Sequence, residues 1–174
     1  MGSSPSADVY YGYDLGDLTG EDFEDLRPQW WQDDEEWEEA LARKLGWAEV
    51  PYPDFGEEYN SRYRAAEWDE RQRMDQERYE TPEYEAWSDS RDEMRRLLSQ
   101  VQVEIDRYGY YDEPTYALRV KASVQGVGDW GSVELEPLVV QSIWDTQLQH
   151  FVELLELRML DGLKPGWHLN CSYG

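Results

Sequence analysis

Hydrophobic positions follow a helical spacing in the first hundred residues and alternate with polar positions after that. Trp37, Leu41 and Leu45 recur every four residues, as one face of a helix requires, and Gly46 follows at a position typical of a helix end. We therefore expect a helix here, with Trp37 turned toward the core and the neighbouring glutamates toward solvent.

Two further helices are predicted before residue 101. From Glu57 to about Tyr79, acidic residues precede basic ones by four positions, as in Glu58 and Arg62, which is the favourable order on a helix. Thr81 and Pro82 then supply a cap and a first-turn proline. The core face of this third helix is predicted to consist of Tyr84, Trp87, Met94, Leu98 and Val101.

From residue 101 the hydrophobic period changes to two, which is typical of strands. Val101, Val103 and Ile105 form the first alternating run, and a third short strand is expected around Val133 and Leu135, ending at Pro137. The clearest strand lies between these two, over residues 115–124. Its buried face is predicted to contain Tyr116, Leu118, Val120, Ala122 and Val124, and its other face Thr115, Ala117, Arg119, Lys121 and Ser123.

The chain closes with one more helix and one more strand. Ser142 is placed to cap a helix that carries apolar residues through Met159 to Gly162. After a turn at Lys164-Pro165-Gly166, the last strand alternates Trp167, Leu169, Cys171 and Tyr173, and Cys171 is expected to be a core cysteine.

This order predicts an α+β fold, with N-terminal helices packed on a small, mostly antiparallel sheet and a β-β-β-α-β order in the C-terminal half. Residues 1–8 are small and polar, and we expect a flexible tail there. Residues 9–100 form an acidic, aromatic-rich helical region and residues 101–174 the sheet region, together in one domain.

Charge adds a strong constraint on partners. The 174 residues include 39 acidic and 16 basic ones, a net charge of −23, and residues 1–100 hold −17 of it. DNA binding depends on basic side chains that displace counterions, so direct nucleic-acid binding is not expected. Basic protein surfaces, including those that normally hold DNA, attract such a chain. The alternative is that the charge serves solubility alone.

The same composition bears on compartment. One cysteine allows no internal disulfide, and the first eight residues lack a basic and apolar leader. No apolar stretch approaches the roughly 20 residues that span a bilayer. We expect a cytoplasmic protein without membrane contact.

Two motifs match ligand-binding patterns in letters but not in context. Gly126–Gly131 reads G-x-G-x-x-G, yet strand-like residues follow it instead of the helix that a dinucleotide site requires, so we interpret it as a hairpin loop. His168 and Cys171 are three apart on a strand and point to opposite faces, so they cannot share a metal ion. No cofactor or metal is predicted.

Catalytic signatures are equally weak. The chain has no nucleophile elbow, phosphate-binding loop or paired-histidine zinc motif, and only two histidines to act as general bases. Its carboxylates stand in solvated clusters, whereas a working acid needs burial to raise its pKa. An enzyme is therefore not the expected class, although the sequence leaves it open.

The stretch QWWQDDEEWEE, residues 29–39, combines large aromatic side chains with dense negative charge. Trp30 and Trp31 precede the first helix and its periodicity does not explain them. Tyrosine and tryptophan are enriched in protein interfaces, so we expect at least one of the two to be exposed. The predicted partner-binding residues are Trp30, Trp31, Asp33, Asp34, Glu35, Glu36, Glu38 and Glu39.

Three stretches carry a resemblance: YYGYDLGDL (Tyr10–Leu18), EEWEEALARKLGW, and KPGWHLNCSYG (Lys164–Gly174). In them the chain is similar to small acidic proteins of actinobacterial phages. The resemblance implies a context, because such proteins often bind and inhibit host proteins, including defence nucleases. It assigns no functional residue.

We therefore expect a non-catalytic, acidic protein-binding module. Its partner is a protein with a basic surface, in the limit a nucleic-acid-binding host protein that sees the carboxylates as phosphates. One alternative is a small-molecule-binding protein or enzyme with a pocket between sheet and helices. Another is a structural protein whose aromatic patches form a homo-oligomer.

Overall fold

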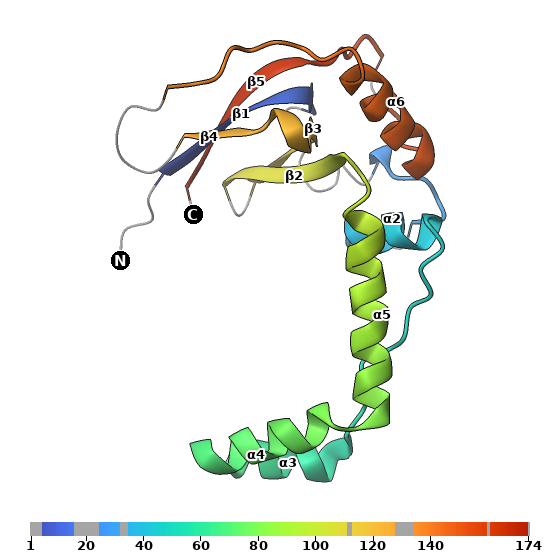
Figure 1. Cartoon of the computed structure of the whole chain (residues 1–174), viewed down its shortest axis with the longest axis vertical. Coiled ribbons are helices and arrows are strands. Elements are labelled where there is room, and N and C mark those ends of the chain that lie inside the picture. Colours follow the sequence, from blue (N-terminus) through green and yellow to red (C-terminus); the bar gives the residue numbers. More distant parts are fainter. Residues whose placement is uncertain are drawn as a thin grey trace. The chain divides into compact units, whose positions relative to one another are not determined.

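Strand β1, Pro5–Asp14, is the middle strand of a five-stranded antiparallel sheet (Figure 1). The computed structural model describes residues 5–15, 25–31, 35–110, 113–127, 134–159 and 161–173. β5 (Gly166–Tyr173) pairs with β1 along one edge, over the register from Pro5 with Tyr173 to Gly12 with Gly166. Residues 5–8 therefore belong to the sheet and not to the predicted tail.

The other edge of β1 is shared by two strands that follow each other in the chain. β3 (Glu113–Val120) pairs with Gly12–Asp14, and the short β4 (Gln125–Val127) pairs with Ala7–Val9. β2 (Val103–Tyr110) pairs with β3 on its far side. Together with the five helices of the described residues, the sheet makes the predicted α+β fold.

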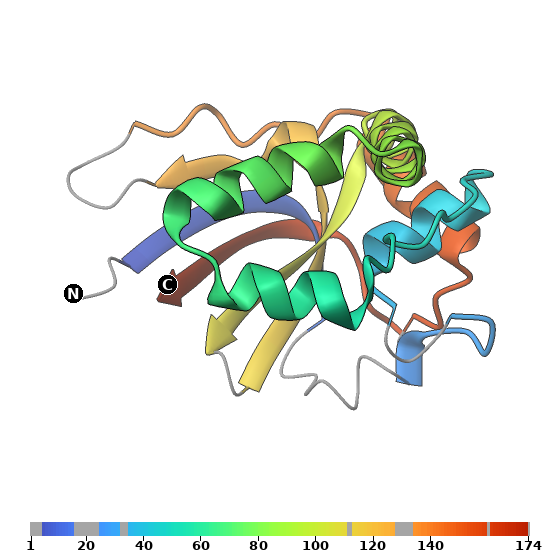
Figure 2. The ribbon, with the colours of Figure 1, turned by 90° about the horizontal axis from the view of Figure 1, so that it is seen from below.

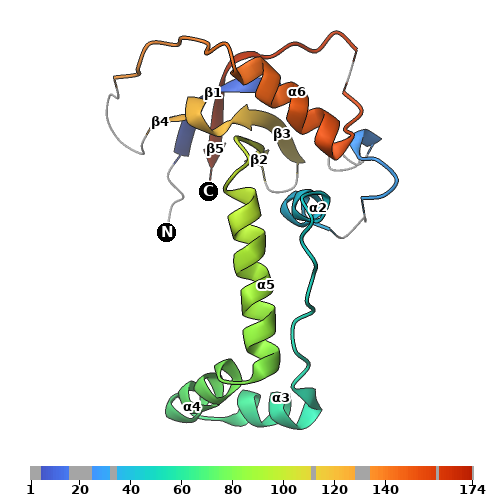
Figure 3. The ribbon, with the colours of Figure 1, turned by 45° about the vertical axis from the view of Figure 1, so that its right-hand side comes forward.

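One face of the sheet lies against α6 (Trp144–Leu155; Figure 3). The buried side chains on this face are apolar. Opposite residues in antiparallel strands share a face, so Leu118 lies beside Ile105 and Val120 beside Val103. All four are buried, as the alternation predicts. From α6 the core receives Trp144, Leu148, Phe151 and Leu155.

The predicted strand over 115–124 ends early, at Val120. A 3-10 turn, Lys121–Ser123, follows, because the Ser123 hydroxyl accepts the Tyr11 N–H at 2.8 Å and donates to the Val120 carbonyl at 2.6 Å. Ser123 is thus buried and Ala122 exposed, opposite to the predicted faces. The third strand also differs: β4 forms at 125–127, Val133 lies outside the described residues, and residues 134–137 form no strand.

The C-terminal elements differ from the prediction in their ends. α6 has Ile143, not Ser142, at its cap position, and it stops at Leu155, where Glu156 adopts a left-handed conformation (φ 55°). β5 is confirmed as a strand, but Cys171 is exposed and Leu169 is 64% exposed. The prediction of a core cysteine is wrong, because β5 lies at a part of the sheet that α6 does not cover at these two positions.

The chain divides into unit 1, Met1–Leu41 with Gln100–Gly174, and unit 2, Ala42–Ser99. The boundary falls within α2 (Trp37–Lys44). The N-terminal segment thus groups with the C-terminal half, whereas the composition groups residues 9–100 together.

Unit 2 contains α3 (Gly56–Ala65), α4 (Trp68–Tyr79) and α5 (Pro82–Leu98). A single helix was expected over 57–79, but the backbone is extended at Ala66 and α4 folds back beside α3 (Figure 2). The fold-back buries Met74, whose carbonyl accepts the Tyr59 hydroxyl at 2.9 Å, and a straight helix could not bring these residues together.

Helix α5 begins as predicted. The Thr81 hydroxyl accepts the Tyr84 N–H at 3.3 Å, and Pro82 occupies the first turn. None of its side chains is fully buried, so the predicted core face is only half-buried. Tyr84 and Trp87 pack instead around Tyr52, with the Trp87 and Tyr52 ring centroids 5.1 Å apart.

Candidate binding surface

Among the described residues of unit 1, the most exposed apolar stretch lies between β4 and α6, and we call it the 134–143 segment. It forms neither helix nor strand before the turn that leads into α6. Exposed fractions of its large aliphatic residues range from 38% to 66%. These residues are Leu135, Leu138, Val139, Val140 and Ile143.

Hydrogen bonds hold the backbone of this segment in place. The Glu136 N–H donates to Gln125 Oε1 of β4 at 2.7 Å, and Gln125 Nε2 donates to the Glu136 carbonyl at 3.5 Å. At the other end, the Trp144 N–H donates to the Gln141 carbonyl at 3.0 Å. The apolar side chains are therefore presented to solvent by an anchored backbone, which lowers the entropy that a partner must remove on binding.

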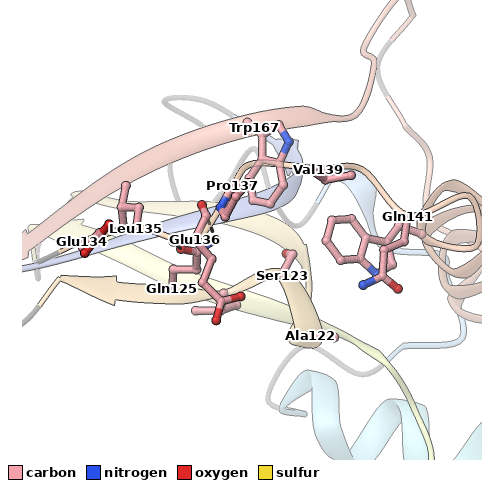
Figure 4. Close-up of a pocket in the computed structure, with 12 residues that line it drawn as sticks. Ala122, Ser123, Gln125, Glu134, Leu135, Glu136, Pro137, Val139, Gln141 and Trp167 are labelled. Carbon is pink, nitrogen blue, oxygen red and sulfur yellow. Dashed lines mark hydrogen bonds between the residues drawn. The ribbon is translucent and has the colours of Figure 1, made fainter.

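A pocket of about 470 Å³ lies between this segment, the turn after β3 and the first residue of α6 (Figure 4). Trp144 and Trp167 form its aromatic wall, with ring centroids 5.7 Å apart at 77°, and Tyr11 packs on both rings. The Tyr11 hydroxyl donates to Asp145 Oδ1 at 2.7 Å, and burial together with this bond raises the pKa of Tyr11 to about 12. Tyr11 therefore stays neutral and fixes the two tryptophans.

The pocket and its unit carry an excess of negative charge. Glu134 and Glu136 line the pocket, and its described lining includes no lysine or arginine. Unit 1 holds 24 acidic and 6 basic residues, a net charge of −18, whereas unit 2 holds 15 and 10, a net charge of −5. Most of the negative charge of the chain therefore lies in unit 1.

The predicted partner-binding tryptophans are not exposed. Trp31 is buried, its indole N–H donates to the Glu35 carbonyl at 2.9 Å, and the Arg27 guanidinium lies 5.6 Å from its ring. Trp30 is half-buried and stacks on Trp31 with centroids 6.3 Å apart. The expectation that at least one is exposed is therefore wrong, because the two rings cover each other.

The carboxylates of the same stretch have different environments. Asp33 and Asp34 lie outside the described residues. Glu36 is exposed, while Glu35, Glu38 and Glu39 are half-buried. Burial, together with nearby Glu36 and Glu39, raises the pKa of Glu38. Trp37 is half-buried and meets Phe151 of α6 edge-on at 6.2 Å, which agrees with its predicted inward direction.

The second face of the sheet carries polar side chains. Arg119 contacts three carboxylates: Glu104 at 2.7 Å, Asp106 at 2.7 Å and Asp8 at 3.4 Å. Burial raises the pKa of Asp106 despite the neighbouring guanidinium. These contacts use Nε and Nη1 of Arg119, and we interpret the network as structural.

Next to this network, Tyr10 is fully buried, its hydroxyl lies 3.4 Å from Asn170 Oδ1, and its ring stacks on His168 at 5.4 Å. His168 Nε2 donates to the Gly12 carbonyl at 3.2 Å. His168 therefore has a structural role on one face of β5, whereas Cys171 is exposed. Within the described ranges, no three His, Cys, Asp or Glu residues gather as a metal site requires.

The glycine motif is only partly described. Gly126 belongs to β4 and pairs with Asp8, while residues 128–131 lie outside the described ranges. In the described part the motif therefore continues a strand.

The sequence did contain a signal for the 134–143 segment. Leu138, Val139 and Val140 are three consecutive apolar residues directly after Pro137, a pattern that fits neither a half-buried strand nor an amphipathic helix. The prediction of a strand around Val133 and Leu135 assigned part of this segment to the sheet, so its exposed apolar residues were not recognised as a surface feature.

Comparison with protein-family models, curated proteins and solved structures finds no match to this chain. Of the helices in the described part of the chain, none has the length and apolar character to cross a membrane.

Proposed function

We propose that the chain is a non-catalytic, acidic protein-binding module of the cytoplasm that docks through unit 1 on a basic surface of another protein. The observation that carries this proposal is the position of five exposed aliphatic residues on an anchored segment of a unit whose net charge is −18. Apolar side chains supply contact area, and the surrounding carboxylates accelerate encounter with a basic partner.

This proposal moves the contact site away from residues 29–39. Trp30 and Trp31 stabilise unit 1, and exposed carboxylates such as Glu36 contribute to its field. The resemblance to small acidic phage proteins supports a host protein as the partner. A nucleic-acid-binding groove, for which the carboxylates substitute for phosphates, is the most specific form of this proposal.

The test is affinity purification of the tagged chain from host extract at low and high salt, with two variants in parallel. Val139→Asp with Ile143→Asp removes apolar contact while making the unit more acidic. Thr146→Asp with Gln149→Asp adds the same charge at exposed positions of α6.

We expect one partner that high salt releases, that the first variant fails to retain and that the second retains. If the unmodified chain and both double variants all retain the partner, the 134–143 segment is not the contact site. Absence of any salt-sensitive partner would contradict the proposed function itself.

A second candidate function, self-association, is favoured by a specific feature of unit 2. Trp68 is 72% exposed, and Tyr52 and Tyr79 are each 49% exposed. Analytical ultracentrifugation over a wide concentration range tests it: a dimer that Trp68→Ser disperses would support self-association, and a monomer at all concentrations would exclude it.

A further inference from the structure

We infer that the pocket beside the 134–143 segment receives an arginine side chain of the basic partner. The inference rests on the proposed function and adds a residue type and a place to it. The pocket lies entirely within unit 1, and residues of three separate stretches form its walls.

The lining suits a guanidinium cation. Arginine stacks its planar group on aromatic rings and donates several hydrogen bonds in one plane. Trp144 and Trp167 provide the rings, and Glu134 and Glu136 provide carboxylates. Figure 4 shows Glu134 at one end of the pocket and Gln141 at the other, with Trp167 between them. A guanidinium in the pocket can face a ring and a carboxylate together.

Charge excludes the opposite class of ligand. The described lining holds two carboxylates and no basic residue, so an anion entering the pocket is repelled. A lysine ammonium is attracted as well, but it is more strongly hydrated and cannot stack as a plane. Arginine is therefore the better match to a wall of two tryptophans.

The experiment follows the indole N–H signals of the ¹⁵N-labelled full chain by NMR during a peptide titration. The probe is a blocked peptide with glycine on both sides of one arginine. The matched probe replaces arginine by citrulline, which has nearly the same shape and no charge. Trp167→Phe assigns the Trp167 signal, and Trp144→Phe assigns its neighbour.

We expect the arginine peptide to shift the Trp167 and Trp144 signals saturably and the citrulline peptide to leave them unchanged. Glu134→Gln with Glu136→Gln should weaken the arginine peptide by about fivefold, as the loss of two partly solvated charge contacts implies. Glu153→Gln with Asp161→Asn is the control, because it removes the same charge at exposed positions outside the lining and should change the affinity little.

Equal shifts with both peptides, no shift with either, or equal weakening by both double variants would overturn the inference. If the peptide produces no shift while affinity purification still recovers a salt-sensitive partner, the arginine pocket is wrong and the proposed function stands. If the arginine peptide binds but no partner is recovered, the inference of an arginine-binding pocket is supported and the proposed docking function is contradicted.

Discussion

Gly12 marks the place where β1 passes closest to β3. A Cβ atom at this position would overlap the Leu118 carbonyl oxygen and lie 2.9 Å from the Arg119 Cα. Both contacts are with backbone, which cannot rotate away as a flexible side chain can. The close crossing of the two strands therefore requires glycine here.

We expect Gly12→Ala to destabilise unit 1 by about 3 kcal/mol or more, because relief of the overlap must separate two paired strands. Urea unfolding followed by circular dichroism measures the change. Gly126→Ala is the matched control, because among the described residues its Cβ would meet the Asp8 carboxylate alone, at 3.4 Å, an ordinary contact. Equal effects of the two substitutions would contradict the explanation.

Trp31 offers a second prediction at this scale. Trp31→Ala should cost about 3–5 kcal/mol, as expected for a buried aromatic residue. Trp31→Phe keeps most of the ring but removes the bond to the Glu35 carbonyl, and should cost about 1 kcal/mol. Trp30→Ala, at a half-buried site, should cost less than Trp31→Ala. The reverse order in thermal melts would show that Trp30 is the anchoring ring.

At the scale of elements, the polar face of the sheet depends on one cation. Arg119 links carboxylates of β1 and β2, and its own side chain is 15% exposed. Arg119→Gln leaves Asp8, Glu104 and Asp106 facing one another. We expect a loss of about 2 kcal/mol, less than for a fully buried pair because the carboxylates are partly solvated.

A double variant separates repulsion from lost packing. Asp106→Asn in the Arg119→Gln background removes one of the repelling charges and should restore part of the stability. If the second substitution lowers stability further, then the Arg119 side chain acts through packing and not through charge.

Alternation predicted β2 and β3 as far as Val120, since those residues face a single apolar layer. It failed at Ser123, because the hydrogen bonds that form the 3-10 turn reach Tyr11, far away in the sequence. Thr81 and Pro82 likewise marked the start of α5, and helical spacing indicated a helix at α6, although its end was placed too late. Helical spacing missed the break at Ala66, which tertiary contacts of Met74 compensate. Where local pattern and distant contact disagreed, the distant contact decided the structure.

The candidate site was less predictable than the fold. The net charge indicated a basic partner, but it did not indicate where on the surface that partner binds, because acidic residues occur along the whole chain. Trp30 and Trp31 attracted attention by composition, and only their mutual stacking reveals that they pack within unit 1. The pocket is formed by residues from three stretches, which no single sequence window contains.

At the scale of the whole molecule, two partly buried carboxyl groups predict an unusual pH dependence of stability. The pKa values of Glu38 and Asp106 are raised in the folded state, chiefly by burial. The folded state then binds more protons than the unfolded state near these pKa values, so stability increases as pH falls through them and levels off below the unfolded values.

We therefore expect the urea midpoint to rise as the pH is lowered from neutral toward the ordinary pKa values of these two carboxyl groups. Asp106→Asn should reduce this rise, whereas Asp69→Asn, at an exposed position of unit 2, should not. A midpoint that falls over this range would mean that favourable ion pairs dominate the titration.

The pairing of β1 with β5 also has a consequence for synthesis. Residues 5–12 of β1 pair on this edge with residues 166–173 of β5, which are made near the end of the described chain. Translation proceeds at about 5–20 residues per second, so a new chain waits roughly ten to thirty seconds after β1 is made before β5 exists. During that interval one whole edge of β1 is open, and Tyr10 and Tyr11 lack their ring partners His168 and Trp167. On a polysome, neighbouring nascent chains can offer the same open edge to one another, and their mutual charge repulsion is then what keeps them apart.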